Sequence, residues 1–315
     1  MKNNHRILKG VIPVVQTLFD KSENIDEYST KKHIKFLKSQ KVGGLWVLGT
    51  GSEDMNLIFK KRIKSAEIIT KENNSKLPLI LGCSFFSIQE IKEFIVETGD
   101  LKFDSYHLMP YHPLLSLKRL TYLYENISDF TMSKFNKKLW LYSSANWSKK
   151  IDFNFIKNFK HNNNIAGIKY STSNAPDQIK VLNLKDENFQ VITAVVRQFI
   201  SNLAAGTLAT TTSVAGAIPE AVNIIYKKFV NGKTKEALKY QIFLNNFLDS
   251  IPKNLKEDNF LGAAEEKYIL SLRGIGQGKI LDYYRSANKK EKKIIKKNIL
   301  LLYKNLGLSR TFKVK

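Results

Sequence analysis

Short apolar runs alternate with longer segments of helical period along most of this chain. The runs lie at 11–16, 44–48, 77–83, 104–109, 139–142, 165–169, 189–194 and 207–212. The segments between them repeat apolar residues three or four positions apart, as Phe59, Ile63 and Ala66 do, which is typical of amphipathic helices. Eight strands separated by helices are the pattern of a (β/α)8 barrel, so we predict an α/β protein of the TIM-barrel class.

The pattern changes after Pro219, where helical segments follow one another without strands between them. We predict a last barrel helix at 219–230 and further helices at 234–251, near 259–273 and at 288–305. The run "RGIGQGK" at 273–279 lacks the spacing of a phosphate-binding loop and is predicted to be a turn between helices. We therefore predict a barrel over 1–232 that contains the site and a small C-terminal helical domain over 233–315.

Length and composition favour a folded protein outside the membrane. The chain has 315 residues, 43% of them hydrophobic, which is enough to bury a sizeable core. No apolar run is long enough for a signal peptide or a spanning helix, so we expect a cytoplasmic protein that does not bind membranes. The single cysteine, Cys83, excludes an intrachain disulfide and a thiolate metal cluster. The five histidines lack metal-binding spacing, with His107 expected to be packed and His33 exposed.

The net charge of +23 raises the question of a nucleic-acid partner. The basic residues are spread along the chain among Asn and Ile, and no zinc-finger or RNA-recognition signature is present. We read the cluster Lys60, Lys61, Arg62 and Lys64 as the solvated face of a helix. We therefore expect no nucleic-acid partner, while a basic surface would attract anionic small substrates.

Lys169 follows the apolar run 165–168 directly, which places it at the C-terminal end of the sixth strand. Active sites of barrels lie at these strand ends. Burial lowers the pKa of a lysine and makes its amine a nucleophile that can form an imine with a ketone. Tyr142 ends the neighbouring strand, and a phenol close to the amine can carry protons. A solvated lysine and a core tyrosine are the alternatives, and the pairing on adjacent strands favours the catalytic interpretation.

The turn "LGTGSED" follows the second strand and is a candidate for binding a carboxylate. Gly49 and Gly51 let backbone N–H groups approach an anion, and the hydroxyls of Thr50 and Ser52 can add donors. A polar glycine turn joins strand to helix in many folds, so this motif is weak by itself. Its place on the same rim as Lys169 is what favours a binding site.

Taken together, these segments resemble the dihydrodipicolinate synthase and N-acetylneuraminate lyase family of class I aldolases. The opening "GVIPVVQTLFD" resembles the family's first strand, "GTGSE" its GTTGE loop, "MPYH" its proline-tyrosine-tyrosine segment, "LYS" its tyrosine strand and "GIKYSTSN" its Schiff-base lysine strand. Further on, "AAGTLATTTSVAGAIPE" resembles the strand-8 segment, and "EEKYILSLRGIGQGKILDYYRSANKKEKKIIKKNI" resembles the C-terminal helices. The resemblance therefore covers nearly the whole chain.

The resemblance implies that Lys169 forms the imine with pyruvate or another 2-keto acid, that Tyr142 shuttles protons, and that the 50–52 loop holds the keto-acid carboxylate. It also implies small-molecule keto-acid and aldehyde substrates, no metal or other cofactor, and a homotetramer built as a dimer of dimers. The residues expected in catalysis are Lys169, Tyr142, Thr50 and His112. Those expected to bind substrate are Gly49, Gly51, Ser52 and Thr211.

Several positions depart from the family pattern. Gly51 and Ser52 replace the second threonine and the glycine of GTTGE, and His112 stands where the synthases have a tyrosine that reaches into the neighbouring subunit. Trp147 stands at the offset of the arginine that binds the aldehyde's carboxylate, with Lys149 and Lys150 as the nearest cations. Ala209 and Gly216 occupy positions where the family usually has Gly and Asn.

These departures leave the imine-forming half of the site intact and change the half that receives the second substrate. We therefore favour a lyase or aldolase that joins a 2-keto acid to an aldehyde, with a sugar-derived acid as one option. Dihydrodipicolinate synthase proper, acting on pyruvate and aspartate semialdehyde, is one alternative. A catalytically weakened member that binds a keto acid as a sensor or scaffold is the other.

Overall fold

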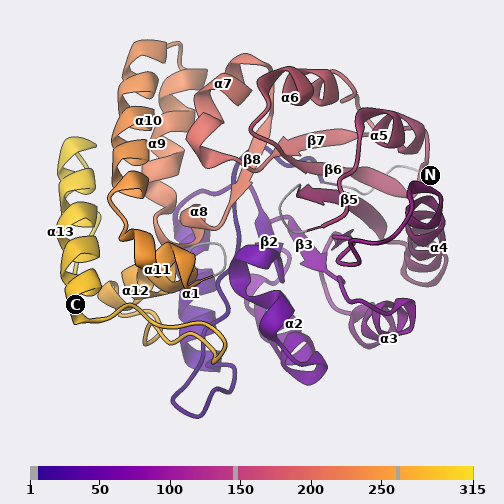
Figure 1. Cartoon of the computed structure of the whole chain (residues 1–315), viewed down its shortest axis with the longest axis horizontal. Helices are drawn as coiled ribbons and strands as arrows, with labels where there is room; N and C mark the ends of the chain where they lie inside the picture. The colour runs from indigo at the N-terminus through magenta and orange to yellow at the C-terminus, as the bar shows by residue number, and fades with distance from the viewer. Residues whose placement is uncertain (1–5, 145–147, 260–262, 315) are drawn as a thin grey trace.

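The protein is described by a computed structural model that covers residues 6–144, 148–259 and 263–314. Its strands pair in parallel in the order β1-β8-β7-β6-β5-β4-β3-β2, and a bridge between Val14 and Trp46 joins the two outer strands of this order. The strands are β1 (Gly10–Pro13), β2 (Leu45–Val47), β3 (Leu79–Gly82), β4 (Ser105–Leu108), β5 (Lys138–Ser144), β6 (Ile165–Ser171), β7 (Gln190–Thr193) and β8 (Ala209–Thr212). The predicted (β/α)8 barrel is confirmed, and each predicted run overlaps one strand (Figure 1).

Helices connect successive strands and cover the barrel. They are α1 (Glu27–Ser39), α2 (Phe59–Asn73), α3 (Ile88–Thr98), α4 (Leu117–Phe135), α5 (Phe153–Phe159), α6 (Ala175–Leu182), α7 (Phe199–Ala204), α8 (Val214–Ala217) and α9 (Pro219–Val230). Short 3-10 turns lie at η1 (Thr50–Ser52), η2 (Asp54–Asn56) and η3 (Val196–Gln198). Many of the helices begin at a polar side chain that accepts from the first turn, namely Asp26, Ser87, Ser116, Asp152 and Asn174.

The C-terminal helices α10 (Thr234–Asp249), α11 (Lys253–Glu257), α12 (Ala263–Leu272) and α13 (Lys289–Asn305) lie at one side of the barrel (Figure 1). They share an apolar core with α9, to which Ile225, Leu244 and Ile299 contribute. The "RGIGQGK" run falls between α12 and α13 as predicted. In the described ranges, no helix is both long enough and apolar enough to span a membrane. The domain boundary at 232–233 stays a prediction.

Aromatic side chains fill the barrel interior below the strand ends. On β4, the hydroxyl of Tyr106 points outward and lies 2.9 Å from that of Thr98 on α3, whereas His107 points inward and stacks on Trp46 at 4.3 Å between ring centroids. Trp140 lies edge-on to Trp46 at 6.1 Å. Side chains along each strand alternate between the outside and the inside of the barrel, so the inward-facing aromatic rings pack closely beneath Lys169 and its neighbours.

Two residues predicted to lie on the surface are buried instead. Arg62 of α2 is 5% exposed, donates to the carbonyl of Ser84 and stacks on the ring of Phe85 at 4.1 Å. His33 of α1 is fully buried, with its Nε2 2.7 Å from the carbonyl oxygen of Gly216. Both predictions were wrong because a long basic side chain in a lysine-rich helix looks the same in sequence whether it meets solvent or a neighbouring loop.

Candidate active site

Lys169 lies on β6 beside Tyr142 of β5, as the two residues are direct partners in the parallel register. Its side chain is 5% exposed, and its amine donates a hydrogen bond to the Tyr142 hydroxyl. Burial lowers the pKa of Lys169 to about 7, an effect that the nearby carboxyl of Asp54 partly opposes. A substantial share of this amine is therefore neutral at neutral pH, which is the form that attacks a carbonyl carbon.

The Tyr142 hydroxyl also lies 3.0 Å from Oγ1 of Thr50, so the three side chains form a continuous chain. Burial raises the pKa of Tyr142 above its ordinary value, and the bond to Thr50 works against that rise. Tyr142 accordingly keeps its proton and can exchange it with the amine on one side and the threonine hydroxyl on the other.

The turn at Gly49–Ser52 is held in one shape by close packing. A Cβ on Gly49 would come within 2.9 Å of the Trp46 ring, and one on Gly51 would come within 2.7 Å of the Cβ of Ser213. Because a 3-10 turn leaves its first N–H groups without acceptors inside the turn, the amides of Thr50 and Gly51 are available to an anion. The hydroxyl of Ser52, expected to face the substrate, donates to the carbonyl of Gly49 at 2.7 Å.

A buried ion pair fixes the C-terminal end of this turn to the C-terminal helices. Glu53 has a left-handed φ of 62° and pairs with Lys267 of α12, and both side chains are almost completely buried. The Lys267 amine also lies 4.3 Å from the centre of the Phe19 ring. The strained backbone at Glu53 is therefore held in place by tertiary contacts.

The remaining predicted residues fall into two groups. Thr211 lies on β8, fully buried beside Ile12 of β1, and its hydroxyl has no hydrogen-bond partner among the described residues. His112 is exposed, and within the described part of the single chain no hydrogen bond or ring contact joins it to Lys169. The structure thus brings Lys169, Tyr142 and Thr50 together but leaves His112 on the surface. Trp147 lies outside the described residues, and Lys149 is partly buried while Lys150 is exposed.

Sequence reasoning missed a buried carboxyl beside this group. Asp54 is 1% exposed and accepts a hydrogen bond from Tyr111, while its Oδ1 has no partner within the described ranges. Burial raises the pKa of Asp54, and the positive charge of Arg62 opposes that rise. Its position after a polar turn gave no sign of burial, because an aspartate there is usually solvated.

His107 is packed, as predicted, but the sequence did not indicate its contacts. Its Nε2 lies 3.0 Å from the carbonyl oxygen of Val47, so that nitrogen carries the proton, and its Nδ1 has no partner in the part of the chain that the structure describes. Gly82 provides the space, since a Cβ there would come within 2.7 Å of the imidazole. Burial, followed by the charge of Lys169, lowers the pKa of His107 well below its ordinary value.

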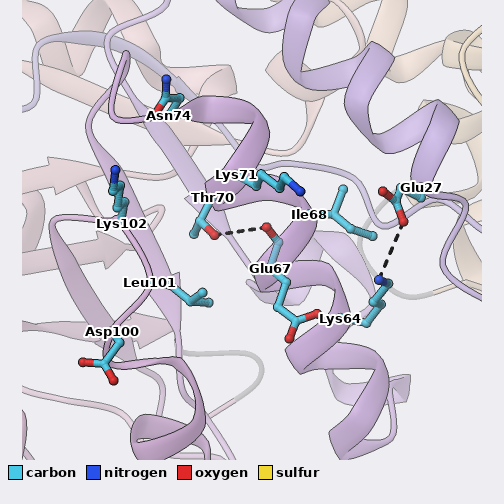
Figure 2. Close-up of a pocket in the computed structure, with 10 residues that line it drawn as sticks. All are labelled: Glu27, Lys64, Glu67, Ile68, Thr70, Lys71, Asn74, Asp100, Leu101 and Lys102. Carbon is cyan, nitrogen blue, oxygen red and sulfur yellow. Dashed lines mark hydrogen bonds and ion pairs between the residues drawn. The ribbon is translucent and has the colours of Figure 1, made fainter.

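A groove on the outer side of α2 is a separate feature. Figure 2 shows Glu67 and Lys71 on α2, Asn74 directly after it, and Leu101 and Lys102 on a neighbouring segment. Glu27 and Lys64, which form an ion pair, line it as well. Its lining is mixed in charge and includes none of the residues around Lys169, so it is not the candidate active site.

The chain matches one known protein family along most of its length. A sequence model of the Dihydrodipicolinate synthetase family matches residues 7–299, which is nearly the whole chain. The chain belongs to this family. Within the family, a 2-dehydro-3-deoxy-D-gluconate/2-dehydro-3-deoxy-phosphogluconate aldolase of Picrophilus torridus is 27% identical over 56% of this chain and 64% of its own length, just under two thirds. A 4-hydroxy-tetrahydrodipicolinate synthase of Methanosphaerula palustris is 22% identical over 86% of this chain and 91% of its own.

Solved structures of family members share the fold at low sequence identity. A catalytic-lysine mutant of the sialic acid aldolase of Ruminococcus gnavus has a TM-score of 0.88 and 19% identity, covering 98% of this chain and 99% of that one. YagE, a prophage protein of the dihydrodipicolinic acid synthase family from E. coli K12 in complex with pyruvate, has a TM-score of 0.85 and 19% identity, covering 94% and 99%. At this identity the likeness establishes the fold alone.

Proposed function

We propose that the protein is a class I lyase or aldolase that condenses or cleaves pyruvate or a related 2-keto acid with an aldehyde through an imine on Lys169. The observation that carries this proposal is the buried chain Lys169, Tyr142 and Thr50 at the strand ends. Family membership supports the chemistry, because the relatives are named as aldolases and a synthase. Loss of turnover in Lys169→Ala is the result that tests it.

In the proposed mechanism, the neutral amine of Lys169 attacks the C2 carbonyl carbon of the keto acid. Tyr142 delivers a proton to the carbinolamine hydroxyl, which leaves as water and gives a protonated imine. The protonated imine makes the C3–H bond acidic, so the Tyr142 oxygen, which has given up its proton, can accept a C3 proton and leave an enamine. C3 of the enamine attacks the aldehyde carbon, whose oxygen takes a proton from Tyr142, and the same steps in reverse break the bond. Oγ1 of Thr50 lies 3.0 Å from the Tyr142 hydroxyl and passes protons to and from it.

The keto-acid carboxylate is proposed to bind at the Gly49–Ser52 turn. The amides of Thr50 and Gly51 are free of acceptors within the turn and lie next to the Thr50 side chain that contacts Tyr142. Thr211, with its unpartnered buried hydroxyl, is proposed as a further donor to the substrate. Ser52 would then shape the turn through Gly49 instead of contacting the carboxylate with its own hydroxyl proton.

Two narrower alternatives remain within this proposal. 4-Hydroxy-tetrahydrodipicolinate synthase proper would use the same imine with aspartate semialdehyde as acceptor, and several relatives carry that name. A weakened member that only binds a keto acid would keep the lysine but turn over slowly.

Aspartate semialdehyde is expected to be a poor acceptor. The aldehyde's carboxylate would lack the charge-assisted contact that an arginine provides, worth about 1.5–3 kcal/mol. This loss corresponds to roughly ten- to a hundredfold lower efficiency than with a neutral hydroxylated aldehyde. Condensation rates with pyruvate should be compared across aspartate semialdehyde and a panel of sugar and hydroxy aldehydes. Efficient turnover of aspartate semialdehyde alone would restore the synthase alternative.

We further propose a homotetramer built as a dimer of dimers, with the surface around His112 in the dimer contact. Phe86 is 64% exposed, and its ring centroid lies 5.9 Å from that of Tyr111, the residue directly before His112. Leu114 is 85% exposed. Ile58, at the start of α2, is 64% exposed as well. Such large apolar side chains in water support an interface there. A second chain docked on this surface would bring His112 toward a neighbouring site.

Replacement of His112 by phenylalanine is therefore expected to reduce turnover. A histidine that relays protons would lose both ring nitrogens in His112→Phe, so proton transfer to and from the site should slow. Imine trapping on Lys169 should survive in part, because attack by the amine depends on Tyr142 more directly than on His112. Steady-state rates of the native protein and of His112→Phe, compared at equal folded concentration, would check this. Unchanged turnover would show that His112 has no relay role, and Tyr111 would be tested next.

A further inference from the structure

A polar cluster lies directly behind the proposed carboxylate-binding turn. Gln16 follows β1 in the chain and is fully buried. Its Nε2 donates to the carbonyl oxygen of Gly51 at 3.0 Å and to Oε2 of Glu266 at 2.7 Å. Ser213, which precedes α8, donates to Oε1 of the same Glu266 at 2.8 Å. Glu266 of α12 is 3% exposed, so its carboxyl and the Gln16 amide are shielded from water, while Ser213 is partly buried. It links β1, the turn, α8 and α12 in one network.

The orientation of the Gln16 amide is fixed by this network. The carbonyl of Gly51 can only accept, so the NH2 group of Gln16 must face it, and its second hydrogen is directed to Glu266. The amide oxygen of Gln16 is left without a donor in the described ranges of the chain. A buried polar group without a partner is unfavourable and calls for an explanation. Here the two contacts made by the nitrogen provide it.

The contacts also explain why a glycine occupies position 51. A Cβ at Gly51 would come within 2.7 Å of the Cβ of Ser213, which is closer than real Cβ atoms approach one another. The turn therefore packs closely against Ser213, and Gln16 donates a hydrogen bond to the Gly51 carbonyl. Among the described residues, Glu266 is the one side chain that bonds to both Gln16 and Ser213.

The surroundings of Glu266 favour its neutral form, which suits this place. Burial, reinforced by the neighbouring Glu265, raises the pKa of Glu266 well above its ordinary value, while the bond from Ser213 opposes the rise. Among the described residues no cation forms a salt bridge with it. An ionised carboxylate here would repel a substrate carboxylate bound on the other side of the turn, whereas a neutral carboxyl does not.

We propose that Glu266 is a positioning residue that sets the affinity for the keto acid: through Gln16 and Ser213 it holds the Thr50–Ser52 turn in the shape that binds the keto-acid carboxylate. The inference rests on the proposed function, since it assigns the turn to that carboxylate. Glu266 does not contact the reacting atoms, so its removal should loosen keto-acid binding more than it slows the chemical steps.

The test is borohydride trapping of pyruvate on Lys169 by the full-length protein, with the pyruvate concentration varied. Glu266→Ala is expected to raise the pyruvate concentration for half-maximal trapping by about tenfold or more, while the limiting extent changes much less. Glu266→Gln should restore nearly native behaviour, because its amide oxygen still accepts from Gln16 and its NH2 group can donate to Ser213. If Glu266 only stabilised the fold, Glu266→Ala would lower the midpoint of thermal unfolding but would not raise the pyruvate concentration for half-maximal trapping.

Two further comparisons keep the proposal open to refutation if Glu266→Ala does not fold. Gln16→Leu removes the link to Gly51 and should weaken pyruvate binding in the same way. Gly51→Ala should do so through its clash with the Cβ of Ser213. Glu220→Gln is the matched control, because Glu220 is a buried glutamate that accepts from Arg273 and Tyr303 in a separate network. It should lower stability and leave pyruvate affinity unchanged.

The outcomes separate this inference from the function on which it rests. Trapping on Lys169 of the native protein, with the native half-saturation retained in both Glu266→Ala and Gln16→Leu, would overturn the positioning role and leave the aldolase proposal standing. Half-saturation retained in Gln16→Leu alone would be enough if Glu266→Ala does not fold. No adduct on Lys169 of the native protein would overturn both.

Discussion

Replacement of Lys169 by alanine is expected to abolish turnover, with a loss of more than about 10³-fold. In the proposed mechanism no other side chain can take over, because the imine requires an amine at the strand end that is buried against Tyr142. The measurement is a steady-state rate of condensation or cleavage with pyruvate as the keto acid. Purified variant and native protein should be compared at equal folded concentration, checked by circular dichroism.

The same lysine should set the pH dependence of imine formation. Burial lowers the pKa of Lys169 to about 7, so the neutral amine should accumulate as pH rises through 7 and the rate should level off above it. An unburied lysine would instead give a rate that still climbs near pH 10. Single-turnover imine formation between pH 5.5 and 9, sampled at about eight points, distinguishes the two.

Lys138 provides a matched control for the Lys169 replacement. It begins β5 at the opposite end of the barrel, is 8% exposed, and burial lowers its pKa as well. Lys138→Ala should therefore lose some stability but keep its turnover. Equal loss of activity in the two alanine variants would mean that removing any buried lysine disturbs the fold, and it would contradict the special role of Lys169.

Replacement of Tyr142 by phenylalanine is expected to lower turnover by about 10²- to 10⁴-fold, the usual contribution of a positioned proton carrier. The change removes the only group that contacts both the Lys169 amine and Thr50 Oγ1 in the described site, and it keeps the ring in place. Pyruvate should still bind at the turn, so the loss should appear in kcat more than in KM.

Tyr106→Phe is the control for that variant. Tyr106 is fully buried on the adjacent strand β4, but its hydroxyl faces α3, where it lies 2.9 Å from the Thr98 hydroxyl and donates to the Ile95 carbonyl at 3.2 Å. Its loss should cost about 1 kcal/mol of unfolding free energy and leave kcat unchanged. A Tyr142→Phe variant that keeps native kcat would show that protons reach the carbinolamine by another route.

The fold could be predicted from the chain because the physical signals were local. Each strand is a short apolar run bounded by polar residues, and the last barrel helix, 219–230, agrees with α9 at both ends. Lys169 and Tyr142 were found for a related reason: both stand where an apolar run ends, and parallel strands bring such ends to one rim.

The residues that were missed depend on contacts between distant segments. Arg62 was assigned to a solvated face because its helix is basic, yet the loop after β3 comes down over it and accepts its hydrogen bond through Ser84. Glu266 lies 250 positions from Gln16 in sequence, and no periodicity within α12 indicates that they meet. His33 was misplaced for the same reason, since its partner is the carbonyl of Gly216. Such polar contacts are specified by the assembled fold and not by local pattern.

The most direct test of the central claim is reduction with borohydride in the presence of pyruvate, followed by mass mapping of the proteolytic peptides. The proposed mechanism predicts one adduct, on the peptide that contains Lys169, and its disappearance in Lys169→Ala with other lysines left unmodified. Because the chain is rich in exposed lysines, nonspecific labelling would be spread over many peptides. A spread of that kind with no preference for Lys169, or no adduct at all, would contradict the assignment of this protein as a Schiff-base lyase or aldolase.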